Sequence, residues 1–138
     1  MRRHNFKKLI IWQEAMKLVD QNYLLTATLP DYEKFGLRIQ MNRCSVSIAS
    51  NISEGPSKRT NKHFTKVLGD SLGSAYEWVT QLMVCYPQKF ISEKNFLVLE
   101  EKYKHYRVKF QTLMTSWNQK FKILKQKSLS LDSKRRDS

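Results

Sequence analysis

The chain has 138 residues, and its 25 Lys and Arg against 12 Asp and Glu give a formal net charge of +13. This length suits a single domain with its own hydrophobic core. The apolar run near the N-terminus, Leu9–Trp12, is too short for a secretory signal or a membrane span. The two cysteines, Cys44 and Cys85, follow no metal-binding or redox spacing and suit a reducing compartment. We therefore expect one cytoplasmic domain with no membrane partner.

The positive charge is concentrated at the two ends of the chain. Residues 1–8 carry four cations and no acid, and residues 120–138 carry seven cations and two acids, which leaves +4 for residues 9–119. Blocks of like charge are typical of interaction tails, often for nucleic acid, although they can also serve solubility alone. We expect a basic N-terminal arm at 1–8, a helical bundle at 9–125 and a disordered basic tail at 126–138.

The first predicted helix runs from Leu9 to Thr28 and stops before Pro30. The loop that follows is short, so the next helix should lie antiparallel to the first. The positions expected to be buried are Trp12, Ala15 or Met16, Val19, Tyr23 and Ala27.

The second predicted helix lies within 35–55 and is apolar or small around most of its circumference. Its apolar residues recur at steps of three and four: Leu37, Met41, Cys44, Ile48 and Ile52. Small polar residues stand where a solvated face would carry Lys and Glu: Ser45, Ser47, Ser50, Asn51 and Ser53. Such residues let neighbouring backbones approach closely, so we expect protein around this helix on most sides.

This segment resembles the bacterial four-helix-bundle proteins related to the protein encoded in 23S ribosomal RNA intervening sequences. The residues that carry the resemblance are Phe35, Gly36, Leu37, Gln40, Arg43, Ser47, Ile48, Asn51, Ile52, Glu54 and Gly55, with Trp12, Gln13 and Ala15 before them and Gly73, Ser74, Glu77, Thr80, Gln81 and Leu82 after them. The resemblance implies an all-α, up-down-up-down antiparallel bundle, and such proteins form ring-shaped homopentamers. A more distant branch is the accessory protein of diversity-generating retroelements, which binds a reverse transcriptase and its RNA.

The third predicted helix starts after Thr60, a good N-cap, and ends before Pro87. His63 stands where the resembling family usually has Glu, which removes a negative charge from the helix N-terminus. The cations around that N-terminus are Lys58, Arg59, Lys62 and Lys66. Together with free backbone N–H groups they could bind a phosphate, and a solvated basic loop is the alternative.

Two further features of this helix predict contacts. Gly69 and Gly73 lower helix propensity, and their spacing favours a close approach by another helix, within or between subunits. Trp78 stands where the family usually has Leu, and we expect it to line a contact rather than the innermost core.

The fourth predicted helix has the most regular apolar repeat in the chain. Its seam alternates steps of three and four through Phe96, Leu99, Tyr103, Tyr106, Phe110, Leu113 and Trp117. This is the 3.5-residue repeat of a left-handed bundle, so we assign these aromatics to the core rather than to base stacking. A helix that continues to Leu124 would overhang the bundle, at the point where the C-terminal lysines begin.

The sequence lacks the motifs of the enzymes that use helical bundles. No Glu-x-x-His pair, Arg-to-His nuclease spacing, zinc spacing or Gly-rich phosphate loop is present. The polar residues of the resembling pattern could be mistaken for catalysts: Gln40, Arg43, Asn51, Glu54, Glu77 and Gln81. Because no nucleophile or metal ligand accompanies them, we predict that they form a buried structural network. We therefore expect no catalytic residue, no metal and no cofactor.

The leading functional hypothesis is a non-enzymatic, basic, oligomeric RNA-binding scaffold. It would be an accessory to an RNA-handling enzyme such as a reverse transcriptase, with the homopentamer multiplying the charge. The predicted nucleic-acid contacts are Arg2, Arg3, Lys7, Lys8, Lys58, Arg59, Lys62, Lys66, Lys120, Lys122, Lys125, Lys127, Lys134, Arg135 and Arg136. The alternative is a protein–protein adaptor that targets an acidic protein and has no direct role with nucleic acid.

Overall fold

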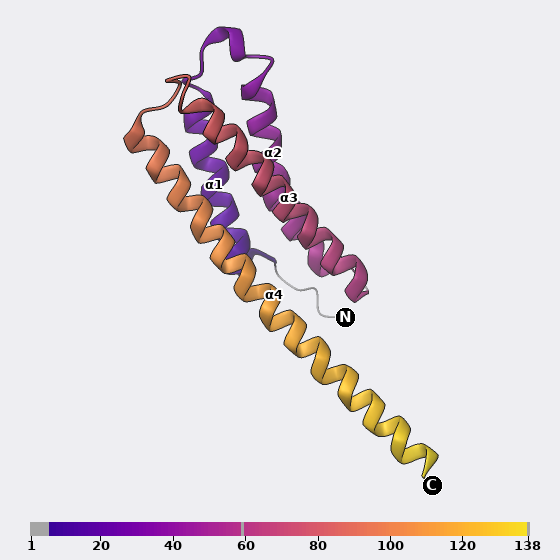
Figure 1. Cartoon of the computed structure of the whole chain (residues 1–138). Helices are drawn as coiled ribbons and strands as arrows, with labels where there is room; N and C mark the ends of the chain where they lie inside the picture. The colour runs from indigo at the N-terminus through magenta and orange to yellow at the C-terminus, as the bar shows by residue number, and fades with distance from the viewer. Residues whose placement is uncertain (1–5, 59, 138) are drawn as a thin grey trace.

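The structure, a computed structural model, describes residues 6–58 and 60–137 and is all-α. Four helices carry the fold: α1 (Ile10–Thr26), α2 (Leu37–Glu54), α3 (Asn61–Cys85) and α4 (Glu93–Arg136). Single 3-10 turns η1 (Phe6–Lys8), η2 (Asp31–Glu33) and η3 (Gly55–Ser57) flank α1, α2 and α3. Successive helices run antiparallel, which confirms the predicted four-helix bundle (Figure 1). The predicted nucleic-acid contacts Arg2, Arg3 and Arg59 lie outside the described residues.

The helix boundaries follow from capping and proline. Thr60 accepts a hydrogen bond from the backbone N–H of His63 at 3.2 Å, which confirms it as the N-cap of α3. Ser92 caps α4 in the same way through the N–H of Asn95, also at 3.2 Å. Pro30 and Pro87 follow the ends of α1 and α3, where neither could continue a helix.

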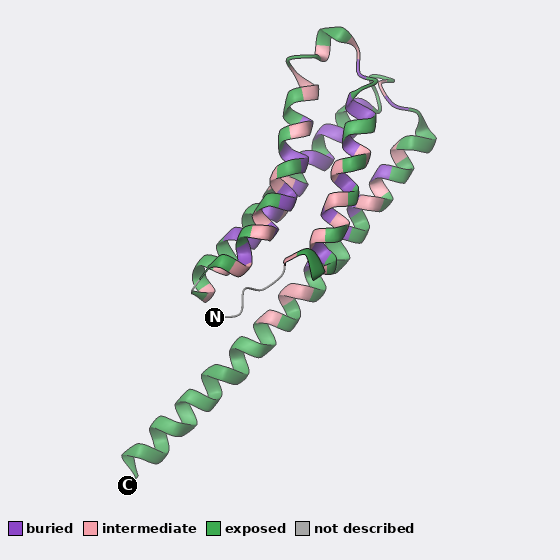
Figure 2. Ribbon diagram, turned by 180° about the vertical axis from the view of Figure 1, so that it is seen from behind, coloured by how far each residue is buried: buried purple, intermediate pink, exposed green. Residues whose placement is uncertain are grey.

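The core is built from one stripe of each helix (Figure 2). The predicted stripe of α2 is buried from Met41 to Ile52, and Leu37 is half-buried. In α4, Leu99, Tyr103, Tyr106 and Phe110 are buried, as the regular apolar repeat predicted. The flanking seam residues Phe96, Leu113 and Trp117 pack against this core while half-buried.

The buried face of α1 differs from the prediction by about one residue. The buried positions are Ile11, Ala15, Leu18, Asn22, Leu25 and Thr26. Of the expected residues, Trp12, Met16 and Val19 are half-buried, whereas Tyr23 and Ala27 are exposed. Ala15 is buried as expected, and the other positions were wrong because the core stripe contains Asn22, a polar residue that an apolar pattern passes over.

Trp78 is completely buried, so the expectation that it lines an outer contact was wrong. Its indole N–H donates to Oδ1 of Asn22 at 2.9 Å. A buried Trp needs a partner for this one polar atom, and a neighbouring helix supplies it here.

Helix α4 is longer than predicted and leaves the bundle as a single projecting helix (Figure 1). Residues 126–136, expected to be a disordered tail, continue the helix to Arg136. No Gly or Pro follows Pro87, and Lys, Leu, Gln and Arg, which favour helix, are frequent near the end. We call residues 118–136 the overhang, and all of them are exposed (Figure 2). No helix among those described is long and apolar enough to cross a membrane.

Candidate nucleic-acid interface

Three groups of cations that are distant in sequence meet at one end of the bundle. At this end η1 leads into α1, η3 joins α2 to α3, and α4 passes on its way out (Figure 1). Lys58 and Lys120 line the same cavity as Leu9, the residue that follows Lys7 and Lys8 of η1. We call this region the basic end. The fold therefore brings Lys58 of the predicted loop and Lys120 of the predicted C-terminal group to one cavity, next to the segment that carries Lys7 and Lys8.

The cavity at the basic end has a volume of about 550 Å³ and mostly apolar walls. The large side chains that line it are Phe64 and Leu68 of α3 and Leu113, Trp117, Phe121 and Leu124 of α4. Phe64 and Trp117 pack ring on ring, with centroids 4.2 Å apart and planes tilted by 34°. The Trp117 indole N–H also donates to Oδ1 of Asn61 in the first turn of α3. These contacts hold the start of α3 against α4, and so determine where the backbone positions of the lysines on both helices lie relative to one another.

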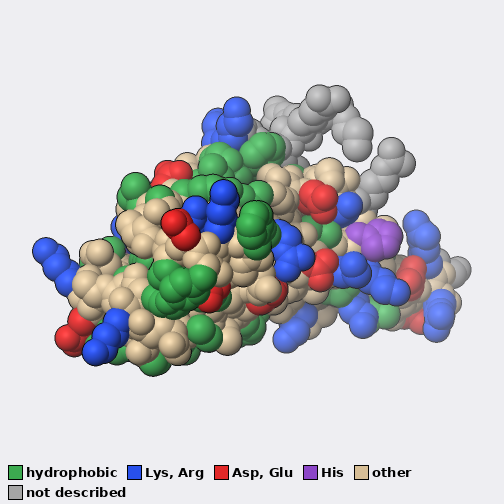
Figure 3. Space-filling view, turned by 90° about the horizontal axis from the view of Figure 1, so that it is seen from above, with side chains coloured by type: hydrophobic (Ala, Val, Ile, Leu, Met, Phe, Trp, Pro, Cys, Tyr) green, Lys and Arg blue, Asp and Glu red, His purple; other side chains and the backbone are tan. Residues whose placement is uncertain are grey.

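The overhang carries the densest positive charge in the described chain. Its cations are Lys120, Lys122, Lys125, Lys127, Lys134, Arg135 and Arg136, and its one acid is Asp132. Successive helical residues are rotated by about 100°, so these cations are distributed around the whole helix. Seen from above, Lys and Arg side chains gather over the narrow end of the molecule, on the right of the view (Figure 3). A helix of this kind presents charge to a polyanion from several sides.

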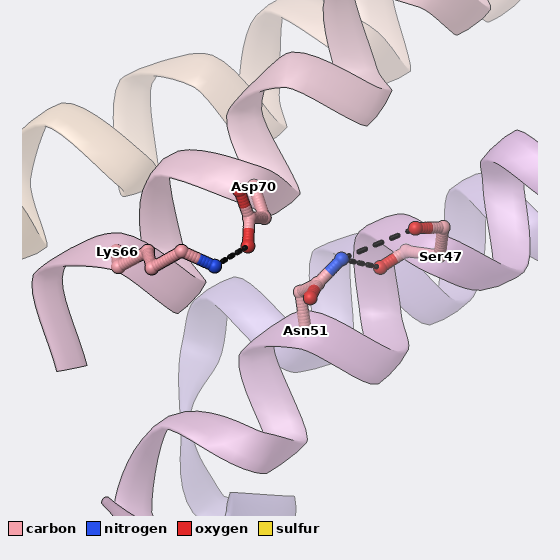
Figure 4. Close-up of polar contacts among 4 residues, drawn as sticks. All are labelled: Ser47, Asn51, Lys66 and Asp70. Carbon is pink, nitrogen blue, oxygen red and sulfur yellow. Dashed lines mark hydrogen bonds and ion pairs between the residues drawn. The ribbon is translucent and has the colours of Figure 1, made fainter. Parts of the chain in front are cut away.

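The N-terminus of α3 is less basic than the sequence suggested. Lys66 forms an ion pair with Asp70 one turn later, with Nζ and the carboxylate oxygen 3.6 Å apart (Figure 4). Exposed pairs of this kind contribute little to stability, but the carboxylate offsets the charge of that lysine. Lys58 and Lys62 are exposed, and His63 is exposed beside them. Among the described residues of this junction, Lys58 and Lys62 are thus the exposed lysines that form no ion pair.

The predicted buried network of polar residues is only partly present. Glu54 and Glu77 are exposed, contrary to the expectation, and so are Gln40 and Arg43. They lie on the outer surface of α2 and α3. Asn51 is half-buried and donates to the backbone oxygen and Oγ of Ser47 at 2.9 and 3.1 Å (Figure 4). Gln81 is buried and reaches Oε1 of Gln40 at 3.5 Å. Gln81 is therefore buried and Asn51 half-buried, whereas Gln40, Arg43, Glu54 and Glu77 line an outer face rather than a core.

Gly69 and Gly73 lie on the same outer surface. A Cβ added at either glycine would meet nothing within 4 Å. The close approach expected from these glycines is thus not made by another helix of the same chain. An approach by a second copy stays a prediction.

A different polar network fills the core and was missed by the sequence analysis. Asn22 donates to Oδ1 of Asn42 at 2.9 Å and to Oγ of Ser45 at 3.1 Å, while it accepts from Trp78. Thr26 donates to the same oxygen of Asn42 at 2.8 Å. The signal was present in the sequence as a polar residue four positions after Leu18 and three before Leu25, within an apolar stripe. This network joins α1, α2 and α3 and fixes how far each helix is shifted along its neighbours.

A second polar contact joins α2, α3 and α4. The hydroxyl of Ser71 donates to the backbone oxygen of Ile48 at 2.8 Å and lies 2.7 Å from the hydroxyl of Tyr106. Burial raises the pKa of Tyr106 well above its usual range. The phenol therefore stays protonated and serves as a structural group in the core.

The thiols are equally unsuited to chemistry at neutral pH. Burial raises the pKa of Cys85 to about 11. The pKa of Cys44 is also raised, chiefly by burial and further by the neighbouring Glu77. A protonated thiol is a poor nucleophile. Within the described part of the chain, no three His, Cys, Asp or Glu residues are grouped so that they could hold a metal ion.

Comparison with known proteins supports the resemblance seen in the sequence. The family model described as 23S rRNA-intervening sequence protein matches residues 7–111. The crystal structure of a protein of unknown function from the S23 ribosomal protein family of Bacteroides thetaiotaomicron matches with a TM-score of 0.70. The two chains are 17% identical, and the match covers 77% of this chain and 96% of that one, which establishes a common fold.

No curated protein sequence matches the chain. The family match ends at residue 111, so the last part of α4, including the whole overhang, lies beyond it. The match nevertheless spans most of the bundle, from η1 to the middle of α4. The chain therefore belongs to the 23S rRNA-intervening sequence protein family.

Proposed function

We propose that this protein binds RNA through contacts to its phosphates, with the basic end of the bundle and the overhang as the binding surface. The observation that carries the proposal is the meeting of Lys58 and Lys120 at one cavity, beside η1 and at the root of the overhang. Clustered cations attract a polyanion and release its counterions on binding. The net charge of +13 favours the same class of partner.

The proposed binding is led by phosphates rather than by stacked bases. Tyr103, Tyr106 and Phe110 are buried in the core and cannot reach a base. Base stacking needs exposed aromatic faces on a platform, as in single-strand-binding folds. Phosphate contacts position a nucleic acid but carry little sequence information. We therefore propose an RNA scaffold of low sequence preference.

The proposed setting is an assembly of several copies with an RNA-handling enzyme. The resemblance to the accessory protein of diversity-generating retroelements makes a reverse transcriptase the proposed enzyme. A homopentamer would carry five overhangs, one on each copy, and so multiply the positive charge presented to the RNA. Gly69 and Gly73, which have open space around them, would supply the flat face for a second copy.

Paired charge variants test the RNA proposal. The variant K58Q/K120Q removes two cations of the basic end, and K34Q/K94Q removes two cations near the opposite end of the bundle. Each lost phosphate contact reduces the log–log salt slope by about 0.7, so two lost contacts correspond to about 25-fold weaker binding at 0.1 M salt when binding at 1 M salt is unchanged. We expect this loss for a single-stranded homopolymer RNA with K58Q/K120Q and a much smaller one with K34Q/K94Q.

Equal binding by the parent and both variants across a salt series would contradict the proposal. In that case the adaptor function, with an acidic protein as partner, would take its place. A circular dichroism melt of each variant is the control, because all four lysines lie at the surface. A variant with an unchanged melt reports on binding alone.

A further inference from the structure

The apolar seam of α4 does not end where the bundle ends. From Trp117 it continues at steps of four, three, four and three through Phe121, Leu124, Ser128 and Leu131. Within the bundle, the same seam packs against the other helices. On the overhang, Phe121, Leu124 and Leu131 are 44%, 57% and 61% exposed. A bundle seam thus runs out of the fold with its apolar side chains uncovered.

The cavity at the basic end opens onto the start of this uncovered seam. Trp117, Phe121 and Leu124 line the cavity and belong to the seam as well. The volume of about 550 Å³ can receive large apolar side chains. The seam and the cavity therefore form one continuous apolar surface that an added helix could cover.

We propose that this surface docks one helix of a partner protein, an amphipathic helix with acidic residues beside its apolar stripe. The mode is a helix laid along an apolar groove, with anchors at steps of three and four. Ser128 leaves room on the seam for a large residue of the incoming helix. The inference goes beyond the RNA proposal and does not depend on it.

The charges beside the seam select an acidic partner. Lys120, Lys127 and Lys134 recur every seven residues along one side of the seam, whereas Lys125 and Asp132 lie along the other side, so the first side is the strongly basic one. In paired helices these flanking positions meet charges of the partner and determine which partner and orientation are preferred. Glu or Asp at the matching positions would form attractive pairs along the overhang.

The Lys120, Lys127 and Lys134 side disfavours an antiparallel second copy of the overhang as the occupant, because that pairing would set these lysines against one another. Like charges placed opposite one another destabilise a pair of helices. Parallel pairing would set Lys120 of one copy against Lys125 of the other, a repulsion, and Lys127 against Asp132, an attraction, so the charges give it little net preference. A helix with acids opposite Lys120, Lys127 and Lys134 gains attraction at all three positions.

A synthetic peptide tests the docking site on the full chain. The peptide has three heptads, Leu at the seam positions, Glu at the flanking positions and a fluorescent label, and its anisotropy reports binding. A matched peptide has Gln in place of every flanking Glu. We expect the Glu peptide to bind the parent protein in the micromolar range and the Gln peptide to bind at least about tenfold more weakly.

Two protein variants of equal net charge distinguish the contribution of the seam to peptide binding from that of the other faces of the overhang. L124D/L131D places acids on the seam, whereas I123D/L129D places acids on other faces, where both residues are also exposed. Burying two Leu side chains contributes enough to affinity that L124D/L131D should lose peptide binding by tenfold or more. I123D/L129D should stay within a few-fold of the parent, because it changes only the net charge.

Several results would overturn the docking proposal. Equal weakening by the two variants would mean attraction by charge alone, and equal binding of the Gln peptide would remove the acidic partner. If light scattering shows that L124D/L131D, but not I123D/L129D, has a lower mass in solution than the parent, a second copy of the chain covers the seam. Loss of RNA binding in L124D/L131D alone would assign the seam to RNA. The RNA proposal is judged separately by the lysine variants, so either proposal can fail alone.

Discussion

Asn22 connects three helices through one buried amide. It accepts from the indole N–H of Trp78 and donates to Asn42 and Ser45, at distances between 2.9 and 3.1 Å. A buried polar group that loses its partner retains the full cost of desolvation. The stability of the bundle should therefore depend on this side chain more than on the carboxylates of the outer face.

We predict that Asn22→Leu lowers the free energy of unfolding by about 2–4 kcal/mol. The substitution fills the same space in the core with an apolar side chain of similar size. It leaves the Trp78 N–H and the Ser45 hydroxyl without this partner. Urea denaturation followed by circular dichroism measures the change. Glu54→Gln is the control, and because Glu54 is exposed it should stay within about 0.5 kcal/mol of the parent. A larger loss of unfolding free energy for Glu54→Gln than for Asn22→Leu would contradict the stabilising role of the Asn22 network.

The elements of the fold were predictable because their patterns are local. The 3.5-residue repeat of α4 identified its core residues, and Thr60 and Pro87 identified the limits of α3 within a residue or two. Trp78 and Asn22 could not be placed in the same way. The buried polar atoms of each are satisfied by side chains of other helices, and a pattern along one helix carries no information on a partner in another helix.

The candidate site was predictable in composition but not in arrangement. Charge counting identified Lys58 and Lys120 separately, 62 positions apart along the chain, whereas their common cavity depends on how α3 and α4 pack. Glu54 and Glu77 were expected to be buried because they belong to the polar residues of the resembling family pattern, with no nucleophile or metal ligand beside them. They are exposed because nothing else in the described chain covers the outer face of α2 and α3.

That outer face is where a second copy would bind in the proposed homo-oligomer. Gly73→Leu should leave the fold of the single chain intact, since a Cβ there meets nothing within 4 Å. If another copy packs on the glycine, the larger side chain should break the assembly. Light scattering should then give several chains for the parent and one chain for Gly73→Leu. Ser116→Leu, at an exposed position of α4, is the control and should keep the parent mass.

A single-chain mass for the parent at micromolar concentration would contradict the proposed oligomer. It would leave the fold and the core network unaffected. It would also lower the expected RNA affinity, because one basic end would then act alone.

At the scale of the whole molecule, the protein combines a weakly charged scaffold with a strongly basic extension. The bundle holds its helices together with apolar stripes and two buried polar contacts, and it carries only +4 between residues 9 and 119. The overhang adds seven cations and an uncovered seam, on a helix that projects by about 24 Å between residues 120 and 136. Binding is therefore expected to reside mainly in the extension and stability in the bundle.

The salt dependence of RNA binding tests this division most directly. The parent and a variant that lacks residues 126–138 are titrated with one single-stranded homopolymer RNA at several salt concentrations. Affinity should fall steeply with salt for the parent, by about 0.7 in log–log slope for each phosphate contacted. The truncated protein should melt like the parent, because residues 126–137 are exposed, but it should bind more weakly and with a shallower slope. A parent that binds no RNA, or two proteins with the same slope, would contradict the account.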